Sequence, residues 1–247
     1  SFLDLEENDT MNFIESLIEE GEINYNTLKS GEIELPISRS LYLDKILQNI
    51  NTNITRNDEY KKIVKQVSNK EIDEQIELPK GLRADLRTYQ ITGFKWLKIL
   101  DNYQFGGILA DDMGLGKTIQ LISVIQSYIE TEKNSKPSMV VCPSSLSLNW
   151  KSEIEKFVPS TKTLVIHGNA EERKKQIESI NEYNLVITSY DLLKRDIDEY
   201  KTTNYSFKYI IADEAQYIKN NNTQNAKAIK EIKSDTRFAL TGTPIEN

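Results

Sequence analysis

Residues 106–118 read G-G-I-L-A-D-D-M-G-L-G-K-T, and the expected fold can be worked outward from them. The apolar run at 108–110 is typical of a buried strand, and two glycines then interrupt it. A helical pattern continues from Lys117 to Ile129. The stretch therefore predicts a strand, a glycine loop and a helix, in that order.

The loop contains the residue types that a phosphate group requires. Gly114 and Gly116 allow the backbone to turn several N–H groups inward, and the N-terminus of the following helix adds positive potential. Lys117 is placed to reach the β- and γ-phosphates, and the Thr118 hydroxyl to coordinate Mg²⁺. The strict pattern G-x-x-x-x-G-K-[ST] has glycine where this chain has Asp111, so an ordinary glycine-rich turn stays an alternative for the loop taken alone.

A second apolar run, far downstream, ends in two acidic residues. Tyr209 to Ala212 predict a buried strand, and Asp213 and Glu214 follow at its carboxyl end, the edge at which open α/β sheets bind ligands. Asp213 suits the shell of a magnesium ion, and Glu214 suits a base that orients water for attack on the γ-phosphate. An acidic pair after a strand is also typical of a helix N-cap, and the glycine loop is what favours catalysis.

Six blocks of sequence occur in order between Leu86 and Glu246. They are L-R-T-Y-Q at 86–90 with Gly93 and Trp96-Leu97, L-A-D-D-M-G-L-G-K-T at 109–118, V-C-P-S-S-L at 141–146 with Asn149-Trp150, I-T-S-Y at 187–190, D-E-A-Q at 213–216 and L-T-G-T-P at 240–244. In these blocks the chain resembles the Swi/Snf-type ATPases of helicase superfamily two, in particular a bacterial member. Those proteins are DNA translocases built from two RecA-like lobes, and their loop has an acidic residue at the position of Asp111.

The resemblance implies roles for individual residues. ATP and Mg²⁺ are the implied ligands, with Lys117, Asp213 and Glu214 as catalytic residues and Thr118 and Asp213 at the metal. Gln90 matches the glutamine that reads the adenine edge in the family, and a solvent-facing glutamine is the alternative. The residues implied in nucleotide binding are Gln90, Met113, Gly114, Leu115, Gly116, Lys117, Thr118 and Gln216.

Two pairs of hydroxyl residues are implied to contact DNA. Ser144 and Ser145 lead into one helix, and Thr188 and Ser189 end another strand, at positions that match family loops following one strand of the duplex. Hydroxyl and backbone N–H groups bind phosphates without reading bases, so binding to double-stranded DNA is expected to be independent of sequence. Ordinary helix capping explains both pairs equally well.

A threonine loop is expected beside the acidic pair. Thr241, Gly242 and Thr243 follow the last predicted strand, at 237–240. Gln216 has no charge and therefore suits a hydrogen-bond relay from the γ-phosphate to this loop and to a second lobe.

Strands and helices alternate downstream of the glycine loop. This alternation indicates a parallel sheet covered by helices on both faces, and together with the resemblance it predicts a RecA-like α/β fold. The further predicted elements are strands at 139–142, 163–166 and 185–188, a helix at 145–157, and one or two helices between Leu82 and Leu100, whose aromatic residues are expected in the core.

Two domains are predicted, an accessory segment at 1–77 and the RecA-like lobe at 78–247. The segment resembles the end of the accessory region that precedes the motor in bacterial relatives, and no motif in it suggests chemistry. Its acidic face is expected to be solvated, with partner binding as the alternative. Its predicted elements are helices at 11–20, 38–50 and 58–67 and a short strand at 31–36.

Composition limits the partners and the compartment. The net charge of the 247-residue chain is −7, of which residues 1–80 carry −8 and residues 81–247 carry +1. A near-neutral lobe has no basic footprint, so weak DNA affinity is expected. The single cysteine, Cys142, cannot form an internal disulfide, and no membrane span or signal peptide is predicted. A cytoplasmic, nucleoid-associated location without a membrane partner is therefore expected.

Two further polar groups have no predicted chemistry. His167 has no Cys or His neighbour in sequence, so a turn residue is predicted rather than a metal ligand. Arg173, Lys174 and Lys175 stand beside two glutamates and are expected on a solvated helix face.

Three classes of function are compatible with these patterns. The favoured class is the first motor lobe of a DNA-translocating ATPase that remodels protein–DNA complexes, with RNA polymerase, a nucleoid protein or a DNA structure as candidate targets. An RNA helicase lobe is one alternative, which the D-E-A-Q and T-G-T-P blocks argue against, and a module that binds nucleotide without turnover is another. Arginines of a second lobe are expected beyond Asn247, so residues 1–247 alone are expected to hydrolyse ATP slowly.

Overall fold

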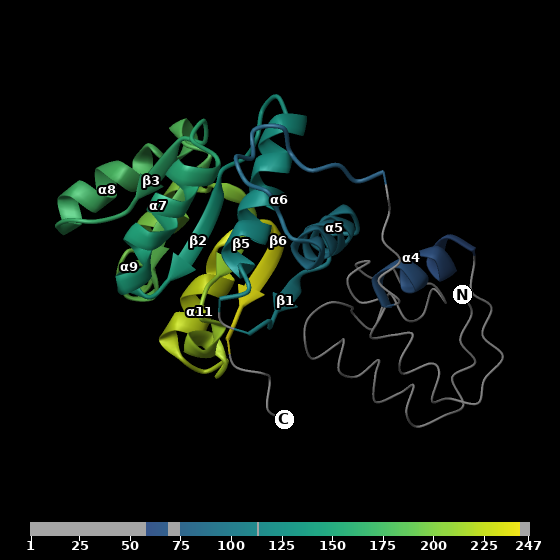
Figure 1. Ribbon diagram of the computed structural model, residues 1–247. Coiled ribbons are helices and arrows are strands. Elements are labelled where there is room, and N and C mark those ends of the chain that lie inside the picture. Colours follow the sequence, from purple (N-terminus) through teal and green to yellow (C-terminus); the bar gives the residue numbers. More distant parts are fainter. Residues whose placement is uncertain (1–57, 69–74, 113, 243–247) are drawn as a thin grey trace, which may run out of the picture. The chain divides into compact units, whose positions relative to one another are not determined.

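The structure is a computed structural model that describes residues 58–68, 75–112 and 114–242 (Figure 1). The chain divides into two compact units, 1–72 and 73–247. The second unit contains the sheet and all the predicted motifs, and its fold is what positions the candidate site.

The described element of the first unit is helix α4 (Asp58–Ser68). Ile63 and Val67 lie one helical turn apart and are both buried, which is the spacing of an amphipathic helix. The helix predicted at 58–67 is therefore confirmed. The helices predicted at 11–20 and 38–50 and the strand predicted at 31–36 lie outside the described residues.

Six parallel strands form one sheet in the order β1-β6-β5-β2-β4-β3. Parallel neighbours need crossover connections, and helices supply them between the strands. The predicted parallel sheet is thus confirmed. The strands are β1 (Gly107–Leu109), β2 (Ser138–Cys142), β3 (Thr163–Val165), β4 (Leu185–Ser189), β5 (Ser206–Ala212) and β6 (Lys233–Leu240).

Two strands begin earlier than predicted, β5 at Ser206 and β6 at Lys233. Their first residues are polar, which hides them from a search for apolar runs. Lys208 forms an ion pair with Asp101 (Nζ to Oδ1, 2.7 Å), and Asp235 forms one with Lys136 (2.7 Å). β1 has the predicted length but begins one residue earlier than 108–110, because Ala110 already belongs to the loop, and the expectation of a buried strand is wrong for Ile108, which is 48% exposed.

Helices cover both faces of the sheet. Helix α5 packs on α6 and α6 packs on α7, whereas α8 packs on α10, and α9 on both α10 and α11 (Figure 1). Residues of α8 to α11 share one core cluster with Met139 and Val141, and the alternation of side chains along β2 turns Val140 to the opposite face. The helices are α5 (Thr88–Asn102), α6 (Lys117–Thr131), α7 (Ser147–Phe157), α8 (Ala170–Glu178), α9 (Tyr190–Arg195), α10 (Ile197–Thr203) and α11 (Gln224–Glu231).

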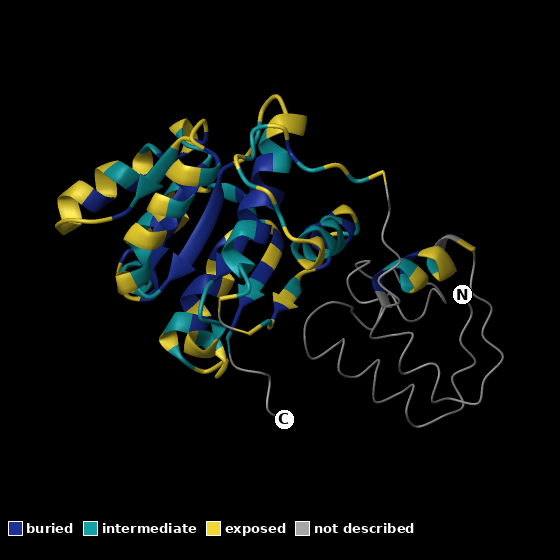
Figure 2. Cartoon of the chain, in the orientation of Figure 1, coloured by how far each residue is buried: buried dark blue, intermediate teal, exposed yellow. Residues whose placement is uncertain are grey.

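The central strands are buried along their whole length. Every residue of β2 and β4 is buried, and Figure 2 shows this part of the sheet in the buried colour. Continuous burial is typical of parallel strands covered on both faces, and it explains why the sequences of β2 and β4 are mainly apolar. The helix predicted at 145–157 is a short 3-10 helix, η2 (Ser144–Leu146), that continues into α7.

A buried carboxylate fastens α5 to the sheet. Asp101, near the end of α5, accepts hydrogen bonds from the Tyr209 hydroxyl (2.6 Å) and the Thr236 hydroxyl (3.2 Å), besides its ion pair with Lys208. Burial of these groups is compensated by their mutual bonds. Burial raises the pKa of Tyr209 above that of free tyrosine, so the hydroxyl stays protonated and acts as a donor. These bonds fasten the C-terminal end of α5 to the sheet.

The prediction of a solvated face at 173–175 is wrong for Arg173. This side chain is buried and donates to both carboxylate oxygens of Asp196 (2.6 and 2.7 Å) and to the Gly168 carbonyl (2.8 Å). The reason is tertiary, because Asp196 is 23 residues away, between α9 and α10. Lys174 and Lys175 are exposed, as predicted.

Among the described helices, none has the length and hydropathy that crossing a bilayer requires.

Candidate nucleotide site

The predicted motifs follow neighbouring strands at one edge of the sheet. The register pairs Leu109 of β1 with Leu240 of β6, and Ala239 of β6 with Ala212 of β5. The backbone N–H of Thr241 donates to the Leu109 carbonyl (3.2 Å), so the threonine loop begins beside the glycine loop. The glycine loop after β1 and the acidic pair after β5 therefore lie on either side of the chain that leaves β6.

The two glycines of the loop have left-handed backbones, with φ of +84° at Gly114 and +74° at Gly116. Helix α6 begins directly after them at Lys117. A Cβ at Gly114 would meet no atom within 4 Å, whereas a Cβ at Gly116 would come 2.4 Å from Gln90 Nε2. The first glycine thus borders open space at a helix N-terminus, which suits an anion.

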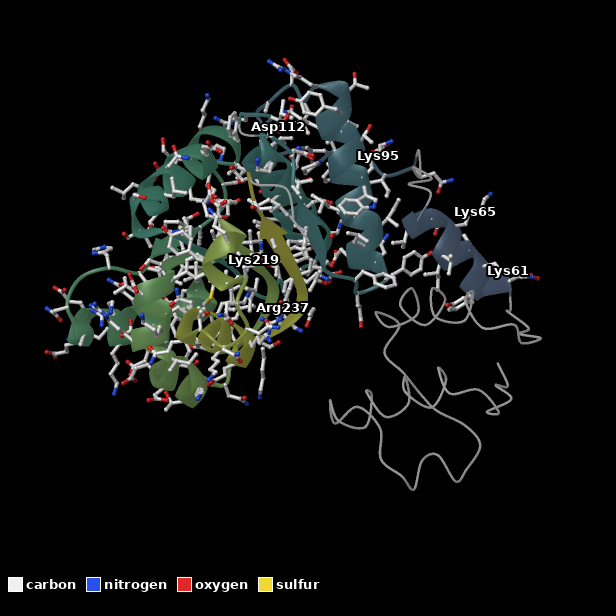
Figure 3. All side chains as sticks on the ribbon, turned by 90° about the horizontal axis from the view of Figure 1, so that it is seen from below. Lys61, Lys65, Lys95, Asp112, Lys219 and Arg237 are labelled. Carbon is white, nitrogen blue, oxygen red and sulfur yellow. The ribbon has the colours of Figure 1, made fainter. Side chains whose placement is uncertain are left out.

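Lys117 folds back over this loop. Its Nζ donates to the backbone carbonyls of Asp111 (2.6 Å) and Asp112 (3.0 Å), and Asp112 itself is exposed (Figure 3). Both acceptors are neutral carbonyls, and a phosphate oxygen is a stronger partner for an ammonium group. Lys117 is therefore held close to the loop without being neutralised by a carboxylate.

The start of α5 rests on the same loop. The Tyr89 hydroxyl and Gln90 Nε2 both donate to the Leu115 carbonyl, each at 3.1 Å, and Gln90 Oε1 accepts from the Arg87 N–H (2.9 Å). The Gln90 amide keeps one further N–H and one further lone pair, which is what an adenine edge needs. The expectation that Tyr89 lies in the core is wrong, because it is 39% exposed and its hydroxyl serves the polar loop.

Asp213 is held by hydrogen bonds on both carboxylate oxygens. Its Oδ2 accepts from Trp150 Nε1 (2.8 Å) and its Oδ1 from the Glu214 N–H (2.9 Å). Burial raises the pKa of Asp213, while these two donors and the charge of Lys117 oppose the rise. The strand register places the glycine loop and this carboxyl at the same edge of the sheet, on either side of β6.

Glu214 has an unusual backbone and a polar neighbour. Its φ of 52° lies in the left-handed region that residues other than glycine rarely adopt, and such conformations are found preferentially at functional sites. Its Oε2 accepts from Gln216 Nε2 (2.7 Å), at the start of the 3-10 helix η4 (Ala215–Ile218).

Gln216 also reaches the threonine loop. The Thr241 hydroxyl donates to Gln216 Oε1 (3.5 Å), a long bond that nevertheless joins β6 to the acidic pair through one amide. A chain of contacts thus runs from Glu214 through Gln216 to Thr241. Gly242 follows Thr241, whereas Thr243 and Met113 lie outside the described residues.

The two hydroxyl pairs predicted to contact DNA differ in exposure. Ser144 and Ser145 are exposed in η2, at the carboxyl end of β2. Thr188 and Ser189 are buried, and Ser189 Oγ caps α9 by accepting from the Leu192 N–H (3.2 Å). Capping therefore accounts for Ser189, and the prediction that the Thr188 and Ser189 side chains meet a phosphate is not supported, because neither is accessible.

Two residues at the site were not predicted to belong to it. Trp150 donates to the Asp213 carboxylate, and the Tyr190 hydroxyl donates to the Asp213 carbonyl (2.8 Å). Trp150 stands four residues before buried Ile154, so its spacing indicates a core position, and only its indole N–H hints at a polar partner. His167, by contrast, lies in the turn between β3 and α8, as predicted.

The residues fit ATP with Mg²⁺. The glycine loop provides open space at the N-terminus of α6, and Lys117 provides a mobile positive charge. Asp213 provides a fixed carboxylate on the other side of β6. In the described part of the chain, no three His, Cys, Asp or Glu side chains are grouped for a metal. Proteins hold Mg²⁺ through one or two ligands together with water and substrate phosphates, and Thr118 and Asp213 are the residues that could provide such ligands.

A parallel sheet with this loop and this acidic pair at its carboxyl edge defines a RecA-like, ATP-binding motor lobe. The chain belongs to the SNF2 family: the family described as SNF2-related domain matches residues 89–247. The family described as bacterial SNF2 helicase associated matches residues 1–79. The predicted resemblance to a bacterial Swi/Snf-type ATPase is therefore confirmed.

Named relatives and solved structures agree with this assignment. An uncharacterized ATP-dependent helicase of Mycoplasma genitalium is 45% identical over 66% of this chain and 16% of its own length. The TATA-binding protein-associated factor MOT1 of Saccharomyces cerevisiae is 39% identical over 69% of this chain and 10% of its own length. The SWI2/SNF2 ATPase core of Sulfolobus solfataricus, solved in complex with double-stranded DNA, is 45% identical over 70% of this chain and 35% of that chain, with a TM-score of 0.62.

The coverage limits what these likenesses transfer. This chain spans about a sixth of the length of the Mycoplasma helicase and about a third of the Sulfolobus core. The matched part contains the candidate nucleotide site. The use of ATP follows from the family, whereas the activities of the longer proteins do not follow directly.

Proposed function

We propose that this chain is the first motor lobe of a DNA-dependent ATPase that moves along double-stranded DNA and remodels protein–DNA complexes. The observation that supports this most is the meeting of the glycine loop and the acidic pair around β6, with Gln216 bonded both to Glu214 and to Thr241. In this proposal, the bond between Gln216 and Glu214 belongs to ATP hydrolysis. The bond between Gln216 and Thr241 transmits the state of the nucleotide to the threonine loop.

Each side chain has a definite role in this proposal. Lys117 leaves the loop carbonyls to bind the β- and γ-phosphates, and the Thr118 hydroxyl and the Asp213 carboxylate hold the magnesium shell. Glu214 orients the attacking water and accepts its proton. Bound Mg²⁺ would neutralise the charge that develops on the transferred phosphoryl group.

Support for DNA as the partner comes from the neighbouring structure and from one loop. The Sulfolobus ATPase core was solved with double-stranded DNA. In this chain the exposed Ser144 and Ser145 stand at the carboxyl end of β2, ahead of α7, where hydroxyl and N–H groups suit a backbone phosphate. We propose sequence-independent contact through Ser144 and Ser145 and leave the buried Thr188 and Ser189 out of it.

The proposal includes a second RecA-like lobe in the same polypeptide. An arginine brought to the phosphates from outside raises turnover by about 10³ to 10⁵ in related phosphoryl-transfer enzymes. Residues 1–247 alone are therefore proposed to bind ATP weakly and hydrolyse it slowly. A cytoplasmic, nucleoid-associated location follows from the proposed substrate, and RNA polymerase, nucleoid proteins and DNA structures remain the candidate targets.

ATP hydrolysis with and without nucleic acid tests the proposal. In the full-length protein, duplex DNA is expected to stimulate hydrolysis several-fold irrespective of its sequence, and duplex RNA is not. Lys117→Ala is expected to abolish nucleotide binding, whereas Glu214→Gln is expected to keep binding and lose turnover. Stimulation by RNA alone would favour an RNA helicase lobe, and nucleotide binding without any turnover would leave a binding module.

A further inference from the structure

The indole of Trp150 has an unusual partner for a core tryptophan. The side chain is 1% exposed, and its Nε1–H donates to Asp213 Oδ2 at 2.8 Å. A buried tryptophan generally finds an acceptor for its N–H, but here the acceptor is a carboxylate at the nucleotide site. Hydrogen bonds to ionised groups are shorter and stronger than neutral ones, so this contact restrains the carboxylate.

Asp213 makes four hydrogen bonds, three of them with other elements of the lobe. Its backbone N–H donates to the Val141 carbonyl of β2 (2.9 Å), and its carbonyl accepts from the Tyr190 hydroxyl of α9. Its two carboxylate oxygens accept from the Glu214 N–H and from Trp150. Of these contacts, the Trp150 bond is the one that a side-chain substitution removes from the carboxylate while leaving the backbone and the acidic pair in place.

Trp150 comes from the first turn of α7, which begins at Ser147 directly after η2. The same turn presents Leu148 to solvent, 72% exposed, next to the exposed Ser144 and Ser145. The first turn of α7 therefore exposes Leu148 on one side and buries Trp150, which contacts Asp213, on the other. The same helical turn thus carries both exposed side chains and the indole that donates to the Asp213 carboxylate.

We propose that Trp150 is a positioning residue that fixes the Asp213 carboxylate for the magnesium–nucleotide complex. It thereby links this carboxylate to the first turn of α7. This inference rests on the proposed function of the site. The bond needs only a donor on a rigid, buried ring. Phenylalanine at this position keeps most of the packing and removes the donor.

The hydrogen bond has a spectroscopic test that does not depend on activity. The chain contains two tryptophans, so it gives two indole ¹H–¹⁵N resonances, and Trp96→Phe assigns them. Asp213→Asn, which removes the charge from the acceptor, is expected to shift the Trp150 resonance and to leave that of Trp96 in place. Addition of Mg²⁺ with ADP to the unsubstituted protein is expected to shift the same resonance.

The functional test uses Trp150→Phe, with Trp96→Phe as the matched control. In the full-length protein we expect Trp150→Phe to raise the Mg²⁺ concentration for half-maximal nucleotide binding about tenfold, the size of effect of a lost bond to a charged group. The kcat for ATP is expected to fall while KM changes little, because the glycine loop is untouched. Trp96→Phe is expected to behave like the unsubstituted protein.

The outcomes separate this inference from the proposed function. A Trp150 resonance that ignores Asp213→Asn, or a folded Trp150→Phe protein with the magnesium dependence of Trp96→Phe, overturns the positioning role. If Trp150→Phe does not fold, the response of the Trp150 resonance to Asp213→Asn decides. An unsubstituted protein that binds no nucleotide overturns the proposed function, while the Asp213→Asn shift still tests the contact.

Discussion

Alanine at Gly116 is expected to disturb the glycine loop in two separable ways. Gly116 has a φ of +74°, and a Cβ there would come 2.4 Å from Gln90 Nε2. Gly114 has a similar φ of +84°, but a Cβ there would meet no atom within 4 Å. Gly114→Ala is therefore a control that bears the backbone cost without displacing Gln90.

The expected loss of stability follows from these contacts. A left-handed alanine costs about 1 kcal/mol in either variant. Gly116→Ala also breaks the bond from Gln90 Nε2 to the Leu115 carbonyl, which contributes about 1 kcal/mol. The free energy of unfolding is therefore expected to fall by about 1 kcal/mol in Gly114→Ala and about 2 kcal/mol in Gly116→Ala.

Two assays measure the consequences. Urea unfolding followed by circular dichroism gives the two losses of stability, and competition between ATP and GTP reports on Gln90. Because the amide proposed to read adenine is displaced, Gly116→Ala is expected to lose its preference for ATP, whereas the methyl of Gly114→Ala weakens both nucleotides alike. Equal stability of the two variants, together with an unchanged ATP preference in Gly116→Ala, would refute the placement of Gln90 on the loop.

Three further predictions concern contacts away from the phosphates. Gln216→Ala in the full-length protein is expected to leave ATP binding near normal and reduce DNA-stimulated hydrolysis, and unchanged stimulation would remove the relay. Burial alone would raise the pKa of Glu130, but its bonds from the Gln126 amide and from two backbone N–H groups lower it. Its contribution to stability is thus present above the unfolded pKa of about 4.3 and lost as the pH falls through the lower folded value, so urea midpoints of wild type and Glu130→Gln should differ at pH 7 and converge in acid. Arg173→Leu, which leaves a buried carboxylate unpaired, is expected to cost about 3 to 5 kcal/mol in urea unfolding, and a loss no larger than that of the exposed Lys174→Leu would contradict this.

The strand–loop–helix at 106–131 and the strand before Asp213 could be predicted from sequence because their signals are local. Apolar runs, paired glycines and acidic residues act within a few positions, and parallel strands bring their carboxyl ends to one edge whatever lies between them. The prediction that the glycine loop and the acidic pair share an edge is confirmed on these grounds. The polar first residues of β5 and β6 were not predicted as strand, because the ion-pair partners of Lys208 and Asp235 lie in other parts of the chain.

Accessibility could not be predicted in the same way. Thr188 is polar and follows an apolar run, and Arg173 lies among charged residues, yet both are buried, whereas Tyr89 is aromatic and exposed. Each case depends on a partner or a covering helix that is distant in the chain. Hydrophobic periodicity indicates which residues share one face of a helix or strand. Only the tertiary structure decides whether another element covers that face.

The sequence by itself indicated the family, through six ordered blocks, and the parallel sheet, through the alternation of strands and helices. It also predicts Lys117, Asp213 and Glu214 as the catalytic residues, because that prediction depends on residue types at short spacing. Only the tertiary structure decided how they are held: the Gln90 amide on the loop, Gln216 between Glu214 and Thr241, and the Trp150 indole on the Asp213 carboxylate. Those bonds join residues as far as 63 positions apart, so their geometry exists only once the sheet has brought its strand ends together.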